Sequence, residues 1–209
     1  MRRNKSQSEK GQLIVFEGPD ESGKTTVSKQ LATALEARGQ SCLWLAFPGH
    51  EPNTLGAEIY ALHHDPRFAA APALSVQLLH VAAHVEAIQL RILPALTAGQ
   101  WVVLDRYWWS TLAYGLAAGV DRRSLESALD IERRQWRRIK PAAAFVFARA
   151  LPNMKRQPAQ RAPLMKIYRQ IILRERRSHP VTLVDNNGPL EEAVNLVSAT
   201  VFKLLPSSQ

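Results

Sequence analysis

The chain of 209 residues has a single cysteine, Cys42, and too few acidic residues to balance its basic ones. One cysteine cannot form an internal disulfide, so a packed core has to stabilise the fold, and the chain is long enough to bury one. The sequence shows no unbroken apolar run of about eighteen residues and no apolar secretion segment near its start. We therefore expect a soluble, cytoplasmic protein.

The shortage of acids leaves a formal net charge of +9. Such a balance favours polyanionic partners, among them nucleotides, nucleic acid and anionic surfaces. The charge is concentrated at 149–177, where nine Lys or Arg residues face one acid, Glu175. Residues 1–10 are polar and unpatterned, so we expect a flexible basic tail there, with contact to nucleic acid as a minor alternative.

Short apolar runs alternate along the chain with stretches of helical periodicity. Apolar strands are expected at 13–17, 41–47, 101–105, 142–148 and 181–185. Helices are expected after the first strand as far as Gly39, and then at 75–96, 109–118, 122–139, 164–175 and 190–205, with an interruption near Pro94. This alternation predicts an α/β protein with a mostly parallel five-stranded sheet and helices on both faces. We find no repeat, linker or second domain, so 11–209 is expected to be one domain.

The stretch GPDESGKT at 18–25 follows the first strand and opens a helix. Its pattern, Gly-x-x-x-x-Gly-Lys-Thr, is typical of a loop whose backbone N–H groups converge on phosphates, because glycines let the backbone approach closely. Lys24 would bridge the β and γ phosphates, and the Thr25 hydroxyl would bind Mg²⁺. The fold is therefore expected to be the three-layer P-loop NTPase fold. The residues expected to bind ATP are Gly18, Glu21, Ser22, Gly23, Lys24, Thr25 and Thr26. The loop alone leaves open a kinase, a GTPase, an ATPase motor or a simple nucleotide-binding protein.

A second polar site is expected where the strand at 101–105 ends. Asp105 is placed to bind Mg²⁺ together with Thr25, directly or through water. Arg106 follows it and offers a planar cation where a phosphoryl acceptor would lie. The alternative is that the two residues form a structural pair.

Five stretches in this order resemble the thymidylate kinase family, from about residue 12 to the C-terminal helix. They are FEGPDESGKTT, LAFPG, LLHVAAHVE, LDRYWWSTLAYG and VTLVDNNGPLEEAV. The resemblance implies a Mg²⁺-dependent homodimer that transfers phosphate from ATP to a nucleoside monophosphate, commonly thymidylate. It also implies a short basic lid at about 149–163, in which Arg156 and Arg161 neutralise the phosphoryl group during transfer. The implied catalytic residues are Lys24, Asp105, Arg106, Arg156 and Arg161.

The same resemblance assigns residues to the acceptor. Asp20 would bind the sugar 3′-hydroxyl, Arg106 the phosphate, and Tyr114 would lie against the 2′ position and favour deoxyribose. Ser110 and Thr111 fall where the family contacts the base. The complete expected acceptor set is Asp20, Phe47, His80, His84, Arg106, Ser110, Thr111 and Tyr114.

Departures from the family pattern fall on this acceptor side. Gly49 stands where the family usually has an arginine, while His80 and His84 replace a base-stacking phenylalanine and a second arginine. The two histidines, one helical turn apart, are weak candidates for a metal pair and better candidates for contacts to the acceptor. Trp108 and Trp109 either pack in the core or interface, or reshape the acceptor pocket. The open alternatives are a different nucleotide or nucleoside as acceptor, or a regulatory ATP-binding protein with weak or no thymidylate kinase activity.

Overall fold

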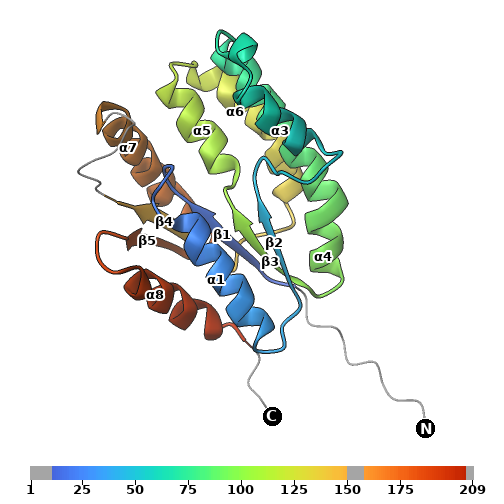
Figure 1. The fold of residues 1–209 in the computed structure, drawn as a ribbon, viewed down its shortest axis with the longest axis vertical. Helices are drawn as coiled ribbons and strands as arrows, with labels where there is room; N and C mark the ends of the chain where they lie inside the picture. The colour runs from blue at the N-terminus through green and yellow to red at the C-terminus, as the bar shows by residue number, and fades with distance from the viewer. Residues whose placement is uncertain (1–10, 150–157, 206–209) are drawn as a thin grey trace.

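The computed structural model describes residues 11–149 and 158–205. The tail predicted at 1–10 lies outside these residues. A parallel sheet forms the centre of the molecule, with strand order β2-β3-β1-β4-β5 (Figure 1). Its strands are β1 (Leu13–Glu17), β2 (Cys42–Ala46), β3 (Trp101–Asp105), β4 (Ala143–Ala148) and β5 (Val181–Asp185). The predicted fold class is confirmed, and three of the strands have the predicted bounds.

Helices cover both faces of the sheet (Figure 1). They are α1 (Lys24–Glu36), α2 (Leu55–His63), α3 (Ala73–Ala87), α4 (Leu93–Thr97), α5 (Trp108–Ala117), α6 (Arg122–Trp136), α7 (Pro158–Glu175) and α8 (Leu190–Phe202), with a 3₁₀ turn η1 (Pro66–Phe68) and a π-helical segment η2 (Ile88–Ile92). Helices α1 and α8 pack on one face of the sheet, and α3 to α7 pack on the other. This arrangement has the three layers that were expected.

The central strand β1 is buried on both sides, as its unbroken apolar run predicts. Successive side chains of a strand point to opposite faces. Accordingly, Leu13 and Val15 belong to the core beneath α3 to α7, while Ile14 and Phe16 belong to the core beneath α1 and α8. Because β1 and β3 are parallel neighbours, their carboxyl ends meet at one edge of the sheet. The loop and the Asp105–Arg106 pair were expected to lie at this edge.

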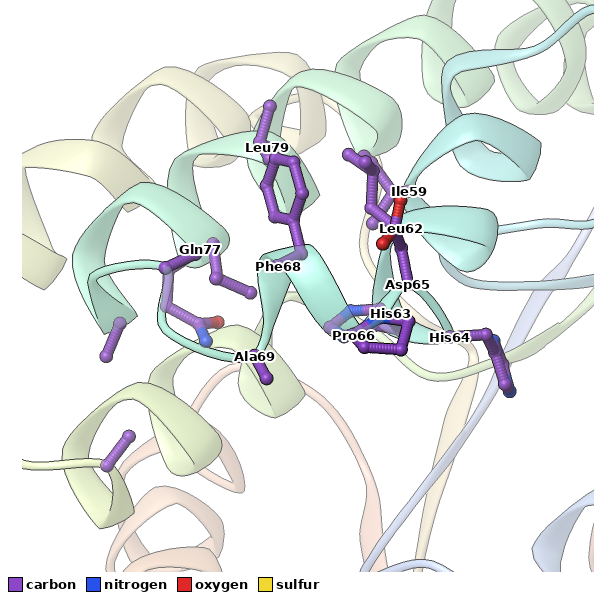
Figure 2. Close-up of a pocket in the computed structure, with 14 residues that line it drawn as sticks. Ile59, Leu62, His63, His64, Asp65, Pro66, Phe68, Ala69, Gln77 and Leu79 are labelled. Atoms are coloured by element: carbon purple, nitrogen blue, oxygen red, sulfur yellow. The ribbon is translucent and has the colours of Figure 1, made fainter.

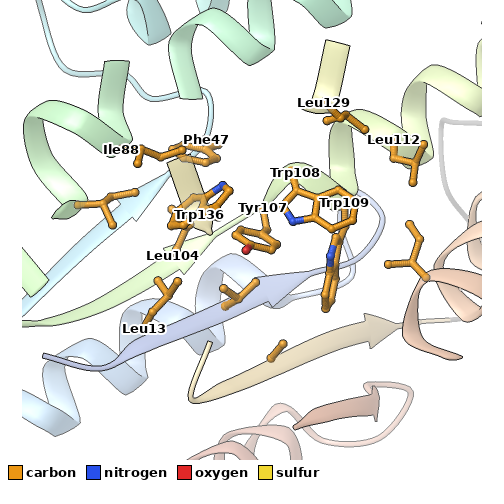
Figure 3. Packing of buried hydrophobic residues seen from close by; sticks show 14 of the residues in the cluster. Leu13, Phe47, Ile88, Leu104, Tyr107, Trp108, Trp109, Leu112, Leu129 and Trp136 are labelled. Carbon is orange, nitrogen blue, oxygen red and sulfur yellow. The ribbon is translucent and has the colours of Figure 1, made fainter. Parts of the chain in front are cut away.

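Trp108 and Trp109 are buried in the larger core with Tyr107 and Trp136 (Figure 3). The rings of Tyr107 and Trp136 have centroids 4.8 Å apart, and those of Trp108 and Trp109 are 6.2 Å apart. Neither of the paired tryptophans lines a cavity described below. The packing alternative for these residues is therefore the right one.

The segment from Ala73 to Thr97 is a nearly continuous helix with a π-helical insert. Pro94 has no N–H to donate to the carbonyl four residues earlier, and just before it the Leu93 N–H bonds the Ile88 carbonyl five residues back. The predicted interruption near Pro94 thus takes the form of a wider turn. By length and composition this segment alone, among described residues, could span a membrane, but a core helix passes the same test. Here the segment packs against α2, α5 and α6.

Candidate active site

The phosphate-type loop requires glycine at both of its marked positions. Gly18 has φ +131°, and a Cβ there would lie 2.4 Å from the Phe147 carbonyl oxygen. Gly23 has φ +89°, and a Cβ there would lie 2.3 Å from the Asn186 side-chain nitrogen. That same nitrogen donates to the Ser22 carbonyl at 2.8 Å. Asn186, which sequence reasoning missed, therefore closes the back of the loop from the end of β5.

Lys24 lies inside this loop rather than on the surface. Its side chain is buried, and Nζ donates to the Pro19 carbonyl at 3.2 Å. Burial lowers the pKa of Lys24, and the Arg106 guanidinium lowers it further, while Asp105 and Asp20 oppose the shift. The ammonium group is thus enclosed by the loop. It donates to one carbonyl oxygen, at the place where it was expected to bind phosphate oxygens. Of the other expected loop residues, Glu21, Thr25 and Thr26 are exposed.

Thr25 and Asp105, the two expected metal-binding residues, are in direct contact. The Thr25 hydroxyl donates to Asp105 Oδ2 at 2.5 Å, and Asp105 is almost fully buried. The other carboxylate oxygen, Oδ1, is buried and has no hydrogen-bond partner. An orphaned carboxylate oxygen beside a hydroxyl is a suitable donor set for Mg²⁺ or its bound water.

Arg106 is held in a fixed position from several directions. Its φ of 76° is unusual for a residue with a side chain, which marks a strained backbone at this point. Nη1 donates to the Ser110 hydroxyl at 3.1 Å, and Nη2 donates to Asp20. Burial alone would lower the pKa of Arg106, but Tyr114, Asp20, Tyr168 and Glu17 together raise it above its ordinary value. The guanidinium is therefore a permanent, oriented cation.

Tyr114 completes this group through two contacts with Asp20. Its hydroxyl accepts from the Asp20 backbone N–H and donates to Asp20 Oδ2, each at 3.1 Å. The Arg106 guanidinium carbon also lies 5.3 Å from the centre of the Tyr114 ring. Asp20 from the loop, Arg106 from the end of β3 and Tyr114 from α5 were predicted separately. The fold brings their side chains into contact.

Glu17 is a buried acid that sequence reasoning left unassigned. Its carboxylate accepts from the backbone N–H groups of Tyr107 and Ser110 and from the hydroxyls of Ser110 and Tyr168, at 2.7 to 2.9 Å. Burial raises the pKa of Glu17, and the Arg106 charge and these donors oppose the shift. The only sequence signal was an acid at the end of an apolar strand, directly before Gly18.

One cavity of about 520 Å³, called the acceptor cavity here, is lined by the residues that were expected to contact the acceptor. Its volume is within the range of small-molecule sites. All eight expected acceptor residues line it: Asp20, Phe47, His80, His84, Arg106, Ser110, Thr111 and Tyr114. Sequence reasoning missed five others, namely Pro48, Tyr60, His63, His64 and Gln77. Three of these five lie on or beside α2, which was not predicted.

Two histidines on this wall are in contact with each other. His63 Nε2 and His80 Nε2 are 2.9 Å apart. Burial lowers the pKa of His80 to about 3, and His84, His63 and Arg106 add to the effect. Burial also lowers the pKa of His63, helped by His64. Among described residues there is no group of three or more His, Cys, Asp or Glu that could hold a metal ion.

A second cavity of about 420 Å³ lies beside His63 and His64. Figure 2 shows its lining residues on α2, the η1 turn and the start of α3. It shares His63, His64 and Gln77 with the acceptor cavity, and the rest of its wall is mainly apolar. The two cavities are therefore neighbours with part of their walls in common.

Two expected catalytic arginines are not placed by the structure. Arg156 lies outside the described residues. The backbone of Arg161 lies in α7, but its side chain is outside the described part. Their assignment to a lid stays a prediction.

The family model for thymidylate kinase matches residues 16–130, more than half of the chain. The chain belongs to the thymidylate kinase family. The resemblance seen in the sequence is thereby confirmed.

Two curated relatives and one solved structure extend this result. The thymidylate kinase of Synechococcus sp. (strain WH7803) is 41% identical over 131 residues, covering 59% of each protein. The thymidylate kinase of Pelotomaculum thermopropionicum (strain DSM 13744 / JCM 10971 / SI) is 39% identical over 118 residues, covering 56% of this chain and 54% of that protein. The chain thus matches little more than half the length of these relatives. A crystal structure of thymidylate kinase from Ehrlichia chaffeensis has TM-score 0.74 at 23% identity, covering 94% of this chain and 100% of that chain, which supports the fold.

Proposed function

We propose that this member of the thymidylate kinase family transfers the γ-phosphoryl group of ATP to a nucleoside monophosphate, with dTMP as main acceptor and dTDP as product. The observation that carries the proposal is the cavity lined by all eight expected acceptor residues. Asp20 belongs both to the phosphate-type loop and to the cavity wall, so donor and acceptor sites are adjacent. Adjacent sites are what direct transfer between two bound nucleotides requires.

The described side chains account for the positioning of both substrates. Loop N–H groups and Lys24 bind the β and γ phosphates of ATP. An oxygen of the acceptor phosphate then bonds to the γ phosphorus while the bond from that phosphorus to the bridging oxygen breaks, and ADP leaves. Arg106, held by Asp20 and Ser110, orients the acceptor phosphate for this step. No general base is needed, because the attacking oxygen already carries negative charge.

Thr25 and Asp105 would hold Mg²⁺. When bound, the ion neutralises negative charge on the β and γ phosphates. The orphaned Asp105 oxygen supports this assignment. The predicted lid arginines, Arg156 and Arg161, would add positive charge near the transferred group.

The acceptor sugar would lie against Asp20 and Tyr114. Asp20 is assigned to the 3′-hydroxyl, and the Tyr114 hydroxyl is fixed by its two bonds to Asp20. A fixed ring at the 2′ position leaves less room for a ribose hydroxyl. The proposed acceptor is therefore a deoxynucleotide.

A panel of acceptors tests the proposed function. ADP release with Mg·ATP is measured in a coupled assay without acceptor and with dTMP, dUMP, dCMP, dAMP, dGMP or thymidine. We expect release that depends on dTMP and exceeds that with the other acceptors. Release that no acceptor changes, together with intact ATP binding, would favour the regulatory ATP-binding protein instead.

Replacing Lys24 tests the donor site. Lys24→Ala should lower kcat by about 100-fold or more, because it removes a cation from the transferring phosphoryl group. Lys29→Ala is the matched control: Lys29 is exposed on the same helix, where Nζ lies 4.8 Å from the centre of the Trp44 ring. Circular dichroism checks that both variants fold. Unchanged turnover in Lys24→Ala would refute the assignment of the loop.

We also propose a cytoplasmic homodimer with no membrane partner, in which contact with nucleic acid is the less favoured alternative. A cytoplasmic location suits the nucleotide substrates and the unpaired Cys42, which is partly buried. A dimer would cover the large apolar side chains that Ala73–Thr97 exposes, Leu78 and Leu90.

A further inference from the structure

A buried polar contact lies behind the wall of the acceptor cavity. His84 Nδ1 is 3.0 Å from Glu132 Oε2, and the two side chains are 3% and 0% exposed. His84 comes from α3 and lines the cavity, whereas Glu132 comes from α6 and does not. Nothing in the loop chemistry or the phosphate contacts uses Glu132.

The second oxygen of Glu132 is also engaged. The Trp136 indole N–H donates to Oε1 at 3.1 Å. An indole nitrogen can only donate, so Oε1 is fixed as an acceptor and the carboxyl group cannot turn freely. Glu132 is thus held by its own helix and directed at the His84 ring.

The His84 ring is fixed by its face as well as by its edge. It stacks on Phe47, with centroids 3.9 Å apart and planes 13° from parallel. With Nδ1 engaged by Glu132, Nε2 is the ring nitrogen left to meet a ligand, and no described residue forms a hydrogen bond with it. Carboxylate partners orient imidazole ligands in this way in metal sites, where they fix which nitrogen is presented.

The surroundings of this nitrogen suit a nucleobase better than a phosphate. Arg106 and Lys24 already mark the end of the site where the acceptor phosphate must meet ATP. Phe47, which is stacked on the His84 ring, adds an apolar aromatic side chain to the same wall, and the Glu132 carboxyl group behind the ring would oppose a second anion. A flat wall with one in-plane hydrogen-bonding atom matches the edge of a planar, uncharged base.

We propose that Glu132 is a positioning residue for acceptor recognition: it orients His84 so that Nε2 hydrogen-bonds the base of the acceptor nucleotide. The inference rests on the proposed function, because it concerns the same cavity. If so, helix α6 influences which acceptor the protein selects, although Glu132 itself does not line the cavity. A histidine at this position presents one fixed nitrogen, whereas an arginine would present several donors at the end of a flexible chain.

Two substitutions at position 84 separate the two ring nitrogens. Asparagine places its amide near Nδ1, where it still reaches Glu132 but offers nothing at the Nε2 position. Glutamine reaches further and offers a polar atom near Nε2. Binding of dTMP and of thymidine, which lacks the phosphate, is measured by calorimetry without ATP. For His84→Asn we expect both dissociation constants to rise about tenfold, the effect of one lost hydrogen bond, and for His84→Gln a smaller rise.

Replacing Glu132 tests positioning. Glu132→Gln should raise the KM for dTMP several-fold while leaving kcat and the KM for ATP near wild type. The matched control is Glu126→Gln on the same helix, whose carboxylate pairs with Arg133 and should not affect the acceptor. In the double variant with His84→Asn, Glu132→Gln should add no further rise in the KM, because the nitrogen it positions is already absent. A purely structural role would instead lower the melting temperature equally in both backgrounds and leave the KM for dTMP unchanged.

The remaining outcomes are distinguishable. Weaker binding of dTMP with unchanged binding of thymidine would move the His84 contact to the phosphate and overturn the inference. If wild-type protein binds thymidine and dTMP but releases no ADP, the proposed function fails while the binding comparison still tests His84. If it binds neither ligand, both proposals are overturned.

Discussion

His80 is a titratable side chain whose neutral form the fold favours. Its pKa in the folded protein is about 3, against 6.5 for an unperturbed histidine. The unfolded chain therefore binds the extra proton first as the pH falls below 6.5. Above pH 6.5 His80 is neutral in both states and does not lower the free energy of unfolding. As the pH falls from 6.5 toward 3, the unfolded chain binds the proton and the folded chain does not, so the free energy of unfolding decreases by up to about 1.4 kcal/mol per pH unit.

The variant His80→Phe should remove this part of the pH dependence. Phenylalanine keeps a ring of similar size but cannot take up a proton. Urea unfolding between about pH 7 and pH 4 should show a shallower loss of stability than in wild type. His80→Leu should flatten the curve equally, which separates the titration from the shape of the ring. An unchanged slope in both variants would mean that another group is responsible.

Sequence reasoning found the residues whose role depends on local spacing. Gly18, Gly23 and Lys24 stand at fixed intervals in one loop, and the backbone there has the conformation that the pattern requires. It missed residues whose role arises from a distant partner. Glu132 meets His84 48 residues away, and Asn186 meets Ser22 164 residues away. No periodicity marks such pairs, because only the completed fold brings them together.

At the scale of elements, one carboxylate joins the end of β1 to α5 and α7. Glu17 accepts from Ser110 at the start of α5 and from the Tyr168 hydroxyl of α7. Tyr168→Phe removes a single donor and should lower the free energy of unfolding by about 1.5–3 kcal/mol, as for hydrogen bonds to charged groups. Tyr60→Phe, at an exposed tyrosine, should change it by less than about 0.5 kcal/mol. Equal stability of the two variants in urea unfolding would contradict this role of Glu17.

Elements with a strong apolar pattern in the sequence were predicted closely. An element whose position depends on contacts with distant parts of the chain was missed. The strands at 13–17 and 101–105 match because their buried runs end at charged residues. The short helix α2 was missed, although the Thr54 side chain caps it by accepting from the Ala57 N–H. It passes so close to the preceding turn that a Cβ at Gly56 would lie 1.9 Å from the Pro48 carbonyl oxygen. That approach, and not helix propensity, places His63 at the acceptor cavity.

At the scale of the whole molecule, the apolar helix Ala73–Thr97 leaves large side chains in contact with solvent. Leu90 is 68% exposed and Leu78 is 46% exposed. If this surface forms the proposed homodimer, then Leu90→Glu places a charge in an apolar contact and should shift the protein to monomer in sedimentation velocity. Leu196→Glu is the control: Leu196 is 45% exposed on α8, across the sheet, and its variant should remain dimeric.

Together with a test of binding to lipid vesicles, the sedimentation experiment shows whether a second copy of the chain or a membrane covers the exposed leucines. A wild-type dimer that Leu90→Glu dissociates, without any binding of wild type to lipid vesicles, assigns the exposed leucines to contact between two copies of the chain. A wild-type monomer at micromolar concentration would contradict the dimer. Because His80 and His84 lie on the same helix as these leucines, dissociation should also raise the KM for dTMP if the partner copy holds that helix in place.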